Sequence, residues 1–363
     1  MLAVMWASAL YNSAGLINIF IQFLLLCQPF MIIAFMVSRE WSPRDVRVVE
    51  WVVFCMITLH TAMAYYQAST TSNQDDVKGL FLGMGAGHHV GGAVALSAAI
   101  YFIRYPLSKS FLVRWLIPIL AAGVVIISDS KQVILVFGLS LGVMFALALK
   151  DVARRRFNQI FKIARFTVLP AILVGLVTLL AVPESSRQRM INDAEEGFTI
   201  KFSVFPIIYS YHDSFLNLLV GLGPGHTITR LAELFQSYKE MLLNMGGTFT
   251  KIPNVIKTED FSHYLTHPAT GTSLFSMRFS WAGIWGDIGT IGIVLYLITW
   301  FYISKHFCKD QLTKFFVINI LLFGITFAWL EEPAYIGIIA IFIGLQLHKD
   351  RAAQEPAMIR SNR

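Results

Sequence analysis

The sequence predicts an all-α, polytopic membrane protein with about nine transmembrane helices and one large extracytoplasmic loop. Of its 363 residues, 56% are hydrophobic and 14% are charged, and the mean hydropathy is +0.61. A soluble domain of this length does not need so much apolar surface. The basic residues also collect in alternate connecting segments, as they do in a chain that crosses a membrane repeatedly.

Each predicted span approaches the roughly 20 apolar residues that a helix needs to cross a hydrocarbon core about 30 Å thick. The spans lie near residues 15–37, 49–66, 80–103, 112–127, 132–149, 166–182, 280–303, 315–330 and 334–347. We expect some of the shorter ones to be tilted, kinked or partly re-entrant.

Charge placement assigns the cytoplasmic side, because arginine and lysine in short loops collect there. That side holds Arg39, Arg44, Arg47, Arg104, Lys109, Arg114, Lys150, Arg154, Arg155, Arg156, Lys162, Arg165, Lys305, Lys309, Lys314, Lys349, Arg351, Arg360 and Arg363. The opposite short loops hold only two basic residues, Lys78 and Lys131. The net charge of +7 therefore follows from topology, and "ARRRF" at 153–157 is interpreted as a topology signal in contact with lipid headgroups rather than as a nucleic-acid site.

This topology divides the chain into four regions. Residues 1–182 are predicted to be N-terminal transmembrane helices, 183–278 the large outer loop, 279–348 C-terminal transmembrane helices, and 349–363 a cytoplasmic tail. The N-terminal "MLAVMWASALYN" would lie outside; it is too short to cross and lacks a basic leader. We therefore expect that one or more N-terminal helices are missing or that the start is unusual.

The cysteines and histidines indicate neither a disulfide framework nor a metal site. Cys27, Cys55 and Cys308 fall in predicted spans or on the cytoplasmic side, so no disulfide is expected in the outer loop. The nine histidines show no His-Glu-x-x-His spacing, and Cys-x-x-Cys does not occur. We expect no metal and no cofactor.

The outer loop mixes charged pieces with apolar pieces that are too short to cross, so amphipathic or re-entrant helices are expected there. "ITRLAELFQSYKEMLLNM" has apolar residues at helical spacing and predicts an amphipathic interfacial helix. Just before it, "VGLGPGH" contains Gly221, Gly223 and Gly225. Its outer location excludes a nucleoside triphosphate, so these glycines either allow a tight re-entrant turn or contact the phosphate of a lipid carrier.

Four short motifs carry a family resemblance: "KGLFLGMGAGHH" at 78–89, "SDSKQ" at 128–132, "LLVGLGPGH", and "RFSWAGIWGDIGTIG" at 278–292. Over about residues 75–295 their arrangement resembles the O-antigen ligase and polymerase family of bacterial membrane glycosyltransferases, which implies a GT-C-like fold. In that family the loop exit reads His-Asn-x9-Gly-x-x-Gly, and here Arg278 and Phe279 replace His-Asn. The histidine is proposed to activate the acceptor in ligases, so we expect a polymerase.

The resemblance and the chemistry name the candidate residues. A lipid diphosphate leaving group needs positive charge, for which the candidates are Lys78, Lys131, Arg278 and, more weakly, Arg230, which an amphipathic helix also explains. Each lysine could equally snorkel to lipid headgroups. Lys131 stands where the family has arginine. The base that activates the acceptor hydroxyl is sought among the outer histidines, with His267 ranked first and His89 second, ahead of His88, His226 and His263. Asp287 occupies the family's acidic position, but a carboxylate there could equally cap a helix or neutralise Arg278.

The expected substrate is a polyprenyl-diphosphate-linked oligosaccharide, joined at the outer face of the bacterial plasma membrane into O-antigen or exopolysaccharide. Membrane lipids, a flippase and a chain-length regulator of the same pathway are the expected partners, and nucleic acid is not. An O-antigen ligase is the first alternative. A transporter of lipid-linked sugars and a non-catalytic envelope scaffold are the others; a transporter would show two comparable halves, and a scaffold would not need Lys78, Lys131 and Arg278 to converge.

Overall fold

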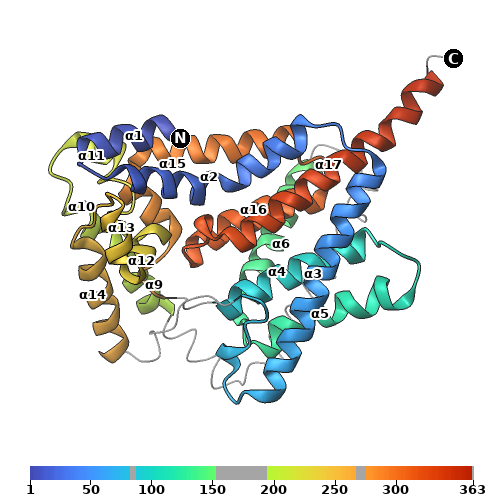
Figure 1. Cartoon of the computed structure of the whole chain (residues 1–363), viewed down its shortest axis with the longest axis horizontal. Helices are drawn as coiled ribbons and strands as arrows, with labels where there is room; N and C mark the ends of the chain where they lie inside the picture. Colours follow the sequence, from blue (N-terminus) through green and yellow to red (C-terminus); the bar gives the residue numbers. More distant parts are fainter. Residues whose placement is uncertain (82–86, 153–193, 267–274, 362–363) are drawn as a thin grey trace. The chain divides into compact units, whose positions relative to one another are not determined.

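The structure, a computed structural model, describes residues 1–81, 87–152, 194–266 and 275–361, and all regular secondary structure in these residues is helical (Figure 1). The N-terminal half contains α1 (Leu2–Tyr11), α2 (Leu16–Ser38), α3 (Pro43–Thr70), η1 (Gln74–Asp76), α4 (Gly87–Arg104), the π-helical turn η2 (Leu112–Leu116), α5 (Ile117–Ile127) and α6 (Lys131–Val152). The rest contains α9 (Ala194–Phe202), α10 (Val204–Tyr209), α11 (Phe215–Val220), α12 (Arg230–Ser237), α13 (Lys239–Asn244), α14 (Ile252–Thr266), α15 (Ser280–His306), α16 (Gln311–Thr326), η3 (Trp329–Glu331) and α17 (Pro333–Ser361).

Three of the described helices, α2, α3 and α15, are long and apolar enough to cross a membrane. Residues 112–127 (η2 and α5) and 131–147 (in α6) are together apolar enough for a fourth crossing, but they are bent by 118° at the 128–130 turn, so they form either one broken span or a re-entrant loop. Helices also cover the predicted span 80–103 from Gly87 onward, most of 315–330 and all of 334–347. Residues 82–86 and the predicted span 166–182 lie outside the described residues. Apolar helices of this kind indicate a membrane protein, and the figure of nine crossings stays a prediction.

The chain forms two compact units, and each is described by itself. The first, called the loop unit, comprises Met1–Gln28, Leu179–Ile303 and Ile320–Ile336. The second, called the helix unit, comprises Pro29–Thr178, Ser304–Asn319 and Gly337–Arg363. The four regions drawn from topology are not tested by this division.

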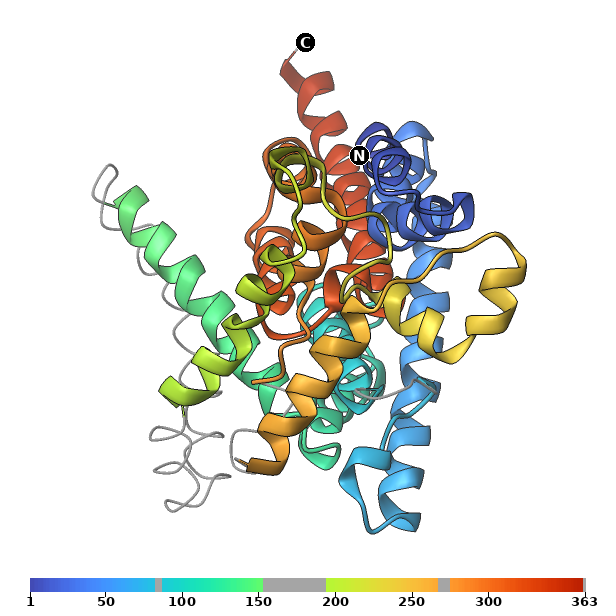
Figure 2. The same cartoon turned by 90° about the vertical axis from the view of Figure 1, so that its left-hand side faces the viewer.

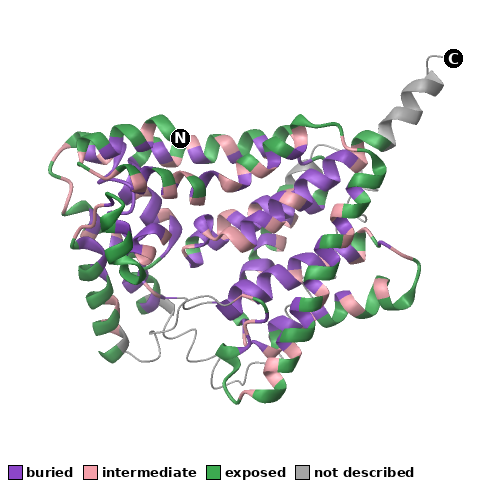
Figure 3. Cartoon of the chain, viewed as in Figure 1, coloured by how far each residue is buried: buried purple, intermediate pink, exposed green. Residues whose placement is uncertain are grey.

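The helix unit is built around α4, which is buried along most of its length (Figure 3). Its sequence is rich in glycine and alanine, so α3 and α5 pack closely against it. At Gly91 a Cβ would lie 2.9 Å from the His60 ring, and at Gly92 one would lie 3.1 Å from Ser130 Oγ. Small residues therefore let polar side chains of α3 and of the 128–130 turn reach the α4 surface.

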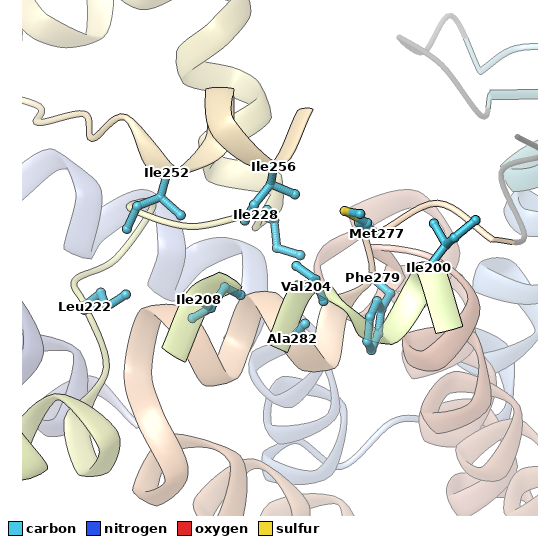
Figure 4. Close-up of a cluster of buried hydrophobic side chains, with 10 residues drawn as sticks. All are labelled: Ile200, Val204, Ile208, Leu222, Ile228, Ile252, Ile256, Met277, Phe279 and Ala282. Carbon is cyan, nitrogen blue, oxygen red and sulfur yellow. The ribbon is translucent and has the colours of Figure 1, made fainter. Parts of the chain in front are cut away.

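The loop unit has its own apolar core, formed by α9, α10, α14, the start of α15 and the segments beside them (Figure 4). Its buried residues are Ile200, Val204, Ile208, Leu222, Ile228, Ile252, Ile256, Met277, Phe279 and Ala282. The turned view of Figure 2 shows that the helices of segment 194–266 are short and change direction from one to the next. Each helix is too short to be stable alone, so this shared core holds them together.

A buried lysine lies at the edge of this core and bonds two neighbouring segments. The Lys201 ammonium donates hydrogen bonds to the carbonyls of Ser276 (2.9 Å) and Thr326 (3.1 Å) and lies 5.0 Å from the centre of the Phe279 ring. Burial lowers the pKa of Lys201 to about 7. Lys201 thus ties α9 to the segment before α15 and to the end of α16.

The amphipathic helix predicted through 228–245 is broken. Helix α12 ends at Ser237, Tyr238 has non-helical backbone angles, and α13 then begins at Lys239. The break lets Leu242 pack beside Leu231 and Phe235 of α12 in one buried cluster. Apolar spacing predicted one continuous helix here and missed the break at Tyr238.

Helix α15 is kinked at Gly289, whose φ of 67° and ψ of −171° are reached almost only by glycine. The kink brings α15 against the end of α11: a Cβ at Gly289 would lie 2.3 Å from the Leu219 carbonyl oxygen. Beside it, the backbone N–H groups of Leu222 and Gly223 donate to the carbonyls of Gly286 (2.7 Å) and Asp287 (3.1 Å). The kink therefore docks the glycine-rich loop on α15.

We predict that Gly289→Ala destabilises the protein by about 2–5 kcal/mol, because backbone strain and overpacking add. Gly246 is the matched control: its φ is also positive, at 81°, but a Cβ there meets nothing within 4 Å. Gly246→Ala should therefore lose only about 1–2 kcal/mol from strain. Thermal unfolding of the purified variants in detergent measures both, and equal losses would show that the contact with Leu219 does not constrain the fold.

Candidate functional site

In the helix unit, the loop after α3 holds Lys78 in a defined position. The Gln67 side-chain oxygen accepts hydrogen bonds from the backbone N–H groups of Lys78 (2.8 Å) and Gly79 (2.6 Å). His60 Nδ1 accepts from the Leu80 N–H (3.1 Å), so Nε2 carries the proton and donates to the Gly91 carbonyl (3.1 Å). Two side chains of α3 therefore anchor this loop, and His60 also bonds α4.

His88 stands at the start of α4 beside this loop. Its Nε2 lies 3.5 Å from Asp75 Oδ1 of η1, and its Nδ1 is buried without a hydrogen-bond partner among the described residues. His89, the predicted base, is buried with its ring centre 3.9 Å from that of His88. An imidazole with one nitrogen near a carboxylate and the other uncommitted is arranged to accept a proton.

Lys131 is brought to the same place by the turn between α5 and α6. Asp129 has a φ of 48°, uncommon for a residue other than glycine, and its carboxylate lies 2.9 Å from Lys131 Nζ. In the same turn Ser130 Oγ donates to the His88 carbonyl (3.1 Å). The turn is thus bonded to the first turn of α4.

These residues form one charged cluster around His88, here called the His88 cluster: Lys78, Asp75, Asp76, His88, His89, Asp129, Ser130 and Lys131. Lys78 pairs with Asp76 at 3.2 Å and Lys131 with Asp129, and all four side chains are at least 28% exposed. Exposed pairs contribute only about 0–1 kcal/mol. Both lysines are therefore free to exchange their aspartate for another anion.

In the loop unit, Asp287 of α15 binds the glycine-rich loop. The carboxylate is fully buried and accepts four hydrogen bonds: from the N–H groups of Gly225 (2.6 Å) and Thr227 (2.9 Å) and from the hydroxyls of Thr227 (2.6 Å) and Thr229 (2.7 Å). Ser8 of α1 donates to the Asp287 carbonyl (2.7 Å). The carboxylate predicted as catalytic is thus saturated by protein donors.

The three loop glycines have positive φ, at 87° for Gly221, 111° for Gly223 and 75° for Gly225. A Cβ at Gly221 would lie 2.4 Å from the Asp287 backbone, and one at Gly225 would lie 2.7 Å from Leu231. Of the two roles predicted for these glycines, the geometry fits the tight turn. His226 closes the loop through Leu222 O (2.9 Å) and Thr248 Oγ1 (2.8 Å), and burial lowers its pKa.

Arg230 begins α12 among three carboxylates. Its guanidinium contacts Glu233 (2.6 Å) and Glu332 (3.5 Å), while its backbone N–H donates to Glu331 (2.6 Å). These carboxylates raise the pKa of Arg230 against the opposing effect of its burial. Arg230 is therefore already neutralised and is less suited than the lysines to bind a diphosphate.

Glu331 is fully buried and also contacts the Gln22 side-chain amide of α2. It lies in η3, outside the predicted spans. Burial raises the pKa of Glu331 to about 8, against the lowering effect of the Arg230 N–H, and the nearby Asp287 charge raises it further.

Arg278 is 43% exposed and pairs with Asp260 of α14 at 3.5 Å. Asp260 also accepts hydrogen bonds from Ser276 Oγ (2.8 Å) and the Met277 N–H (3.0 Å). The sequence-based alternative in which Asp287 neutralises Arg278 is therefore wrong, because Asp287 is engaged by the threonines and Arg278 by Asp260.

Of the predicted site residues, Lys78, Lys131 and His89 lie in the His88 cluster. Asp287 and the loop glycines form one hydrogen-bonded group in the loop unit. Arg230 and Arg278 also belong to the loop unit. His267, ranked first as base, lies outside the described residues. Sequence reasoning missed Asp75, Asp260 and Glu331 as partners, although their positions in outer loops were visible. The described residues contain no group of three or more histidine, cysteine or acidic side chains that could hold a metal ion.

Comparison of the chain with protein-family models, with characterised proteins and with solved structures found no match.

We predict that Glu331 makes stability depend on pH. The pKa of Glu331 in the folded protein lies above the ordinary value of 4.5. The contribution of Glu331 to the stability of the folded protein is therefore complete below about pH 4.5 and is lost as pH rises through about 8. Glu331→Gln keeps an acceptor for the Arg230 N–H but does not ionise, so thermal midpoints measured from pH 5 to 9 should fall less with pH than in the wild type. Glu240→Gln, on exposed α13, serves as control and should keep the wild-type slope. If the thermal midpoints of all three proteins changed with pH in parallel, Glu331 would not be the source of the pH dependence.

Proposed function

We propose that the chain is a membrane glycosyltransferase that polymerises polyprenyl-diphosphate-linked oligosaccharide repeat units at the outer face of the bacterial plasma membrane. This proposal includes the nine crossings, the cytoplasmic C-terminus and the GT-C-like fold expected from the family resemblance. The observation that supports it is the His88 cluster, in which Lys78 of the loop before α4, Lys131 at the start of α6 and a carboxylate-paired histidine at the start of α4 belong to one set of charged contacts.

The two lysines of the cluster, once released from Asp76 and Asp129, offer positive charge to a leaving diphosphate. Helices α4 and α6 begin at Gly87 and Lys131, and helix N-termini favour anions. An incoming diphosphate would replace Asp76 and Asp129 as partner of the two lysines, whose exposed pairs are weak. The lysines would then stabilise the negative charge that develops on the diphosphate as it departs.

His88 is the base that this geometry favours. In the proposed reaction the acceptor hydroxyl oxygen bonds to the anomeric carbon of the donor sugar, the bond from that carbon to the diphosphate oxygen breaks, and the polyprenyl diphosphate leaves. His88 takes the hydroxyl proton, and Asp75 beside its Nε2 stabilises the imidazolium that forms. His89 packs on His88 and supports the orientation of its ring.

Deletion of the gene in the native host, with analysis of surface polysaccharide length, tests the activity. Single repeat units in place of long chains support a polymerase, and unattached long polymer would indicate the ligase instead. Unchanged polysaccharide would reject both enzymes.

Complementation of this deletion tests the residues. Lys78→Gln with Lys131→Gln should lower long-chain polymer at least tenfold, because removing a hydrogen bond to a charged group costs about 1.5–3 kcal/mol. His88→Gln should have a comparable effect. Lys109→Gln, an exposed lysine on the predicted cytoplasmic side, is the control and should restore wild-type chains. Full activity of the double variant at normal protein level would remove both lysines from the site.

A further inference from the structure

Glu331 of η3 is a fully buried carboxyl group that contacts both α2 and α12 in the loop unit. One of its oxygens, Oε2, accepts the Arg230 N–H that begins α12 (2.6 Å), and the other, Oε1, contacts the side-chain amide of Gln22 on α2. Gln22 is fully buried as well. A carboxyl group in such a place has to be either neutral or surrounded by donors and positive charge.

The charges around Glu331 are mostly negative. Arg230 directs its terminal nitrogens to Glu233 (2.6 Å) and Glu332 (3.5 Å) and gives Glu331 a hydrogen bond from its backbone only. An ionised Glu331 would therefore add a buried negative charge that no ion pair within the described ranges offsets. The ionisable groups that face Glu331 are Arg230 and Glu233 of α12, Asp287 and Tyr296 of α15, and Glu332 beside it in the chain.

The available donors decide which of the two buried carboxyl groups holds a proton. Asp287 accepts four hydrogen bonds from the stretch between Gly225 and Thr229, whereas Glu331 accepts one from the next residue, Arg230. The four donors keep Asp287 ionised, and its negative charge opposes ionisation of Glu331 on the other side of the same stretch. Glu331 is therefore the group of this pair that takes up a proton.

Gln22 can bond to either protonation state of Glu331. In the structure its Nε2 donates to Glu331 Oε1, which suits a carboxylate, and its own Oε1 is buried without a hydrogen-bond partner in the described part of the chain. A half turn of the amide brings the Gln22 oxygen to Glu331, where it can accept from a carboxyl O–H. The ionised state thus leaves a buried acceptor unsatisfied, and the protonated state supplies the missing donor.

Gln22 lies on the face of α2 that packs against the glycine-rich loop and α12. One turn earlier on α2, Asn18 donates to the Pro224 carbonyl of that loop (2.7 Å). On the same face, Ile21 and Leu25 pack on the buried cluster formed by α12 and α13. A change of contact at Gln22 is therefore transmitted to the glycine-rich loop and to α12.

We propose that Glu331 is a proton-binding site that controls the contact of α2 with the start of α12. With the proton bound, Glu331 donates to the Gln22 amide oxygen and accepts the Arg230 N–H, so η3 joins the two helices. When the proton leaves for solvent, the new negative charge is repelled by Asp287 and Glu332, and the junction opens more often. The site is separate from the His88 cluster and does not rest on the proposed function.

Infrared spectroscopy of the purified full-length protein in detergent tests the proton, because a protonated carboxyl group gives a C=O band that a carboxylate lacks. The wild type should lose one such band as pH rises, with a midpoint near pH 8. Glu331→Gln should lack the titrating band, whereas Glu332→Gln and the exposed control Glu240→Gln should keep it. Glu233→Gln removes a nearby negative charge and frees the Arg230 guanidinium, so the midpoint should fall by about one pH unit or more.

Hydrogen exchange of the α12 backbone tests the coupling. After correction for the intrinsic rate at each pH, the amides of 230–237 in the wild type should exchange at least about threefold faster above the midpoint than below it. In Glu331→Gln the corrected rates should be equal, and Glu240→Gln should behave as the wild type does.

The outcomes separate the two parts of the proposal. Absence of a titrating band in the wild type, its retention in Glu331→Gln, or an unchanged midpoint in Glu233→Gln would overturn the proton site. Corrected exchange rates that are independent of pH in the wild type would overturn the control of α12. Glu233→Gln carries the test if Glu331→Gln proves unstable in thermal unfolding.

Discussion

Two buried carboxylates hold the segment from Gly225 to Arg230, and the arrangement of the loop unit depends on them. Asp287 accepts four hydrogen bonds from this segment and Glu331 accepts the N–H that begins α12. A buried carboxylate is costly unless donors surround it, so the backbone must follow a path that delivers those donors. The positive φ angles of the loop glycines and the kink at Gly289 are the consequences of that path.

The two units use charge in opposite ways. In the loop unit Asp287 and Glu331 are inaccessible and bonded within the protein, which suits a scaffold. In the helix unit Lys78 and Lys131 hold exposed aspartates that a stronger anion can replace. The rigid carboxylates also place the start of α12, while the exchangeable pairs lie where chemistry is proposed. Burial, rather than residue type, separates the structural acids from the candidate catalytic groups.

Much of the helical architecture could be predicted, because apolar runs long enough for a bilayer are visible in a single sequence. Lys78 and Lys131 could also be selected, since each contradicts the charge bias of its loop. The break at Tyr238 could not be predicted from the sequence, because it depends on Leu242 packing beside Phe235. The hydrogen bond between Glu331 and Arg230 could not be predicted either, because the two residues are 101 positions apart. The local sequence pattern predicts helices and the basic residues that depart from the charge bias of their loops. The hydrogen-bond and packing partners of a residue are set only when distant segments come together in the fold.

The most direct measurement of the central claim is a reaction of the purified protein in liposomes with a labelled, polyprenyl-diphosphate-linked repeat unit. The account predicts products longer by whole repeat units, with one polyprenyl diphosphate released for each linkage formed and no need for a nucleotide sugar. It also predicts that His88→Gln, inserted into the same liposomes, forms linkages at least tenfold more slowly. Intact substrate after prolonged incubation with correctly folded wild-type protein would contradict it.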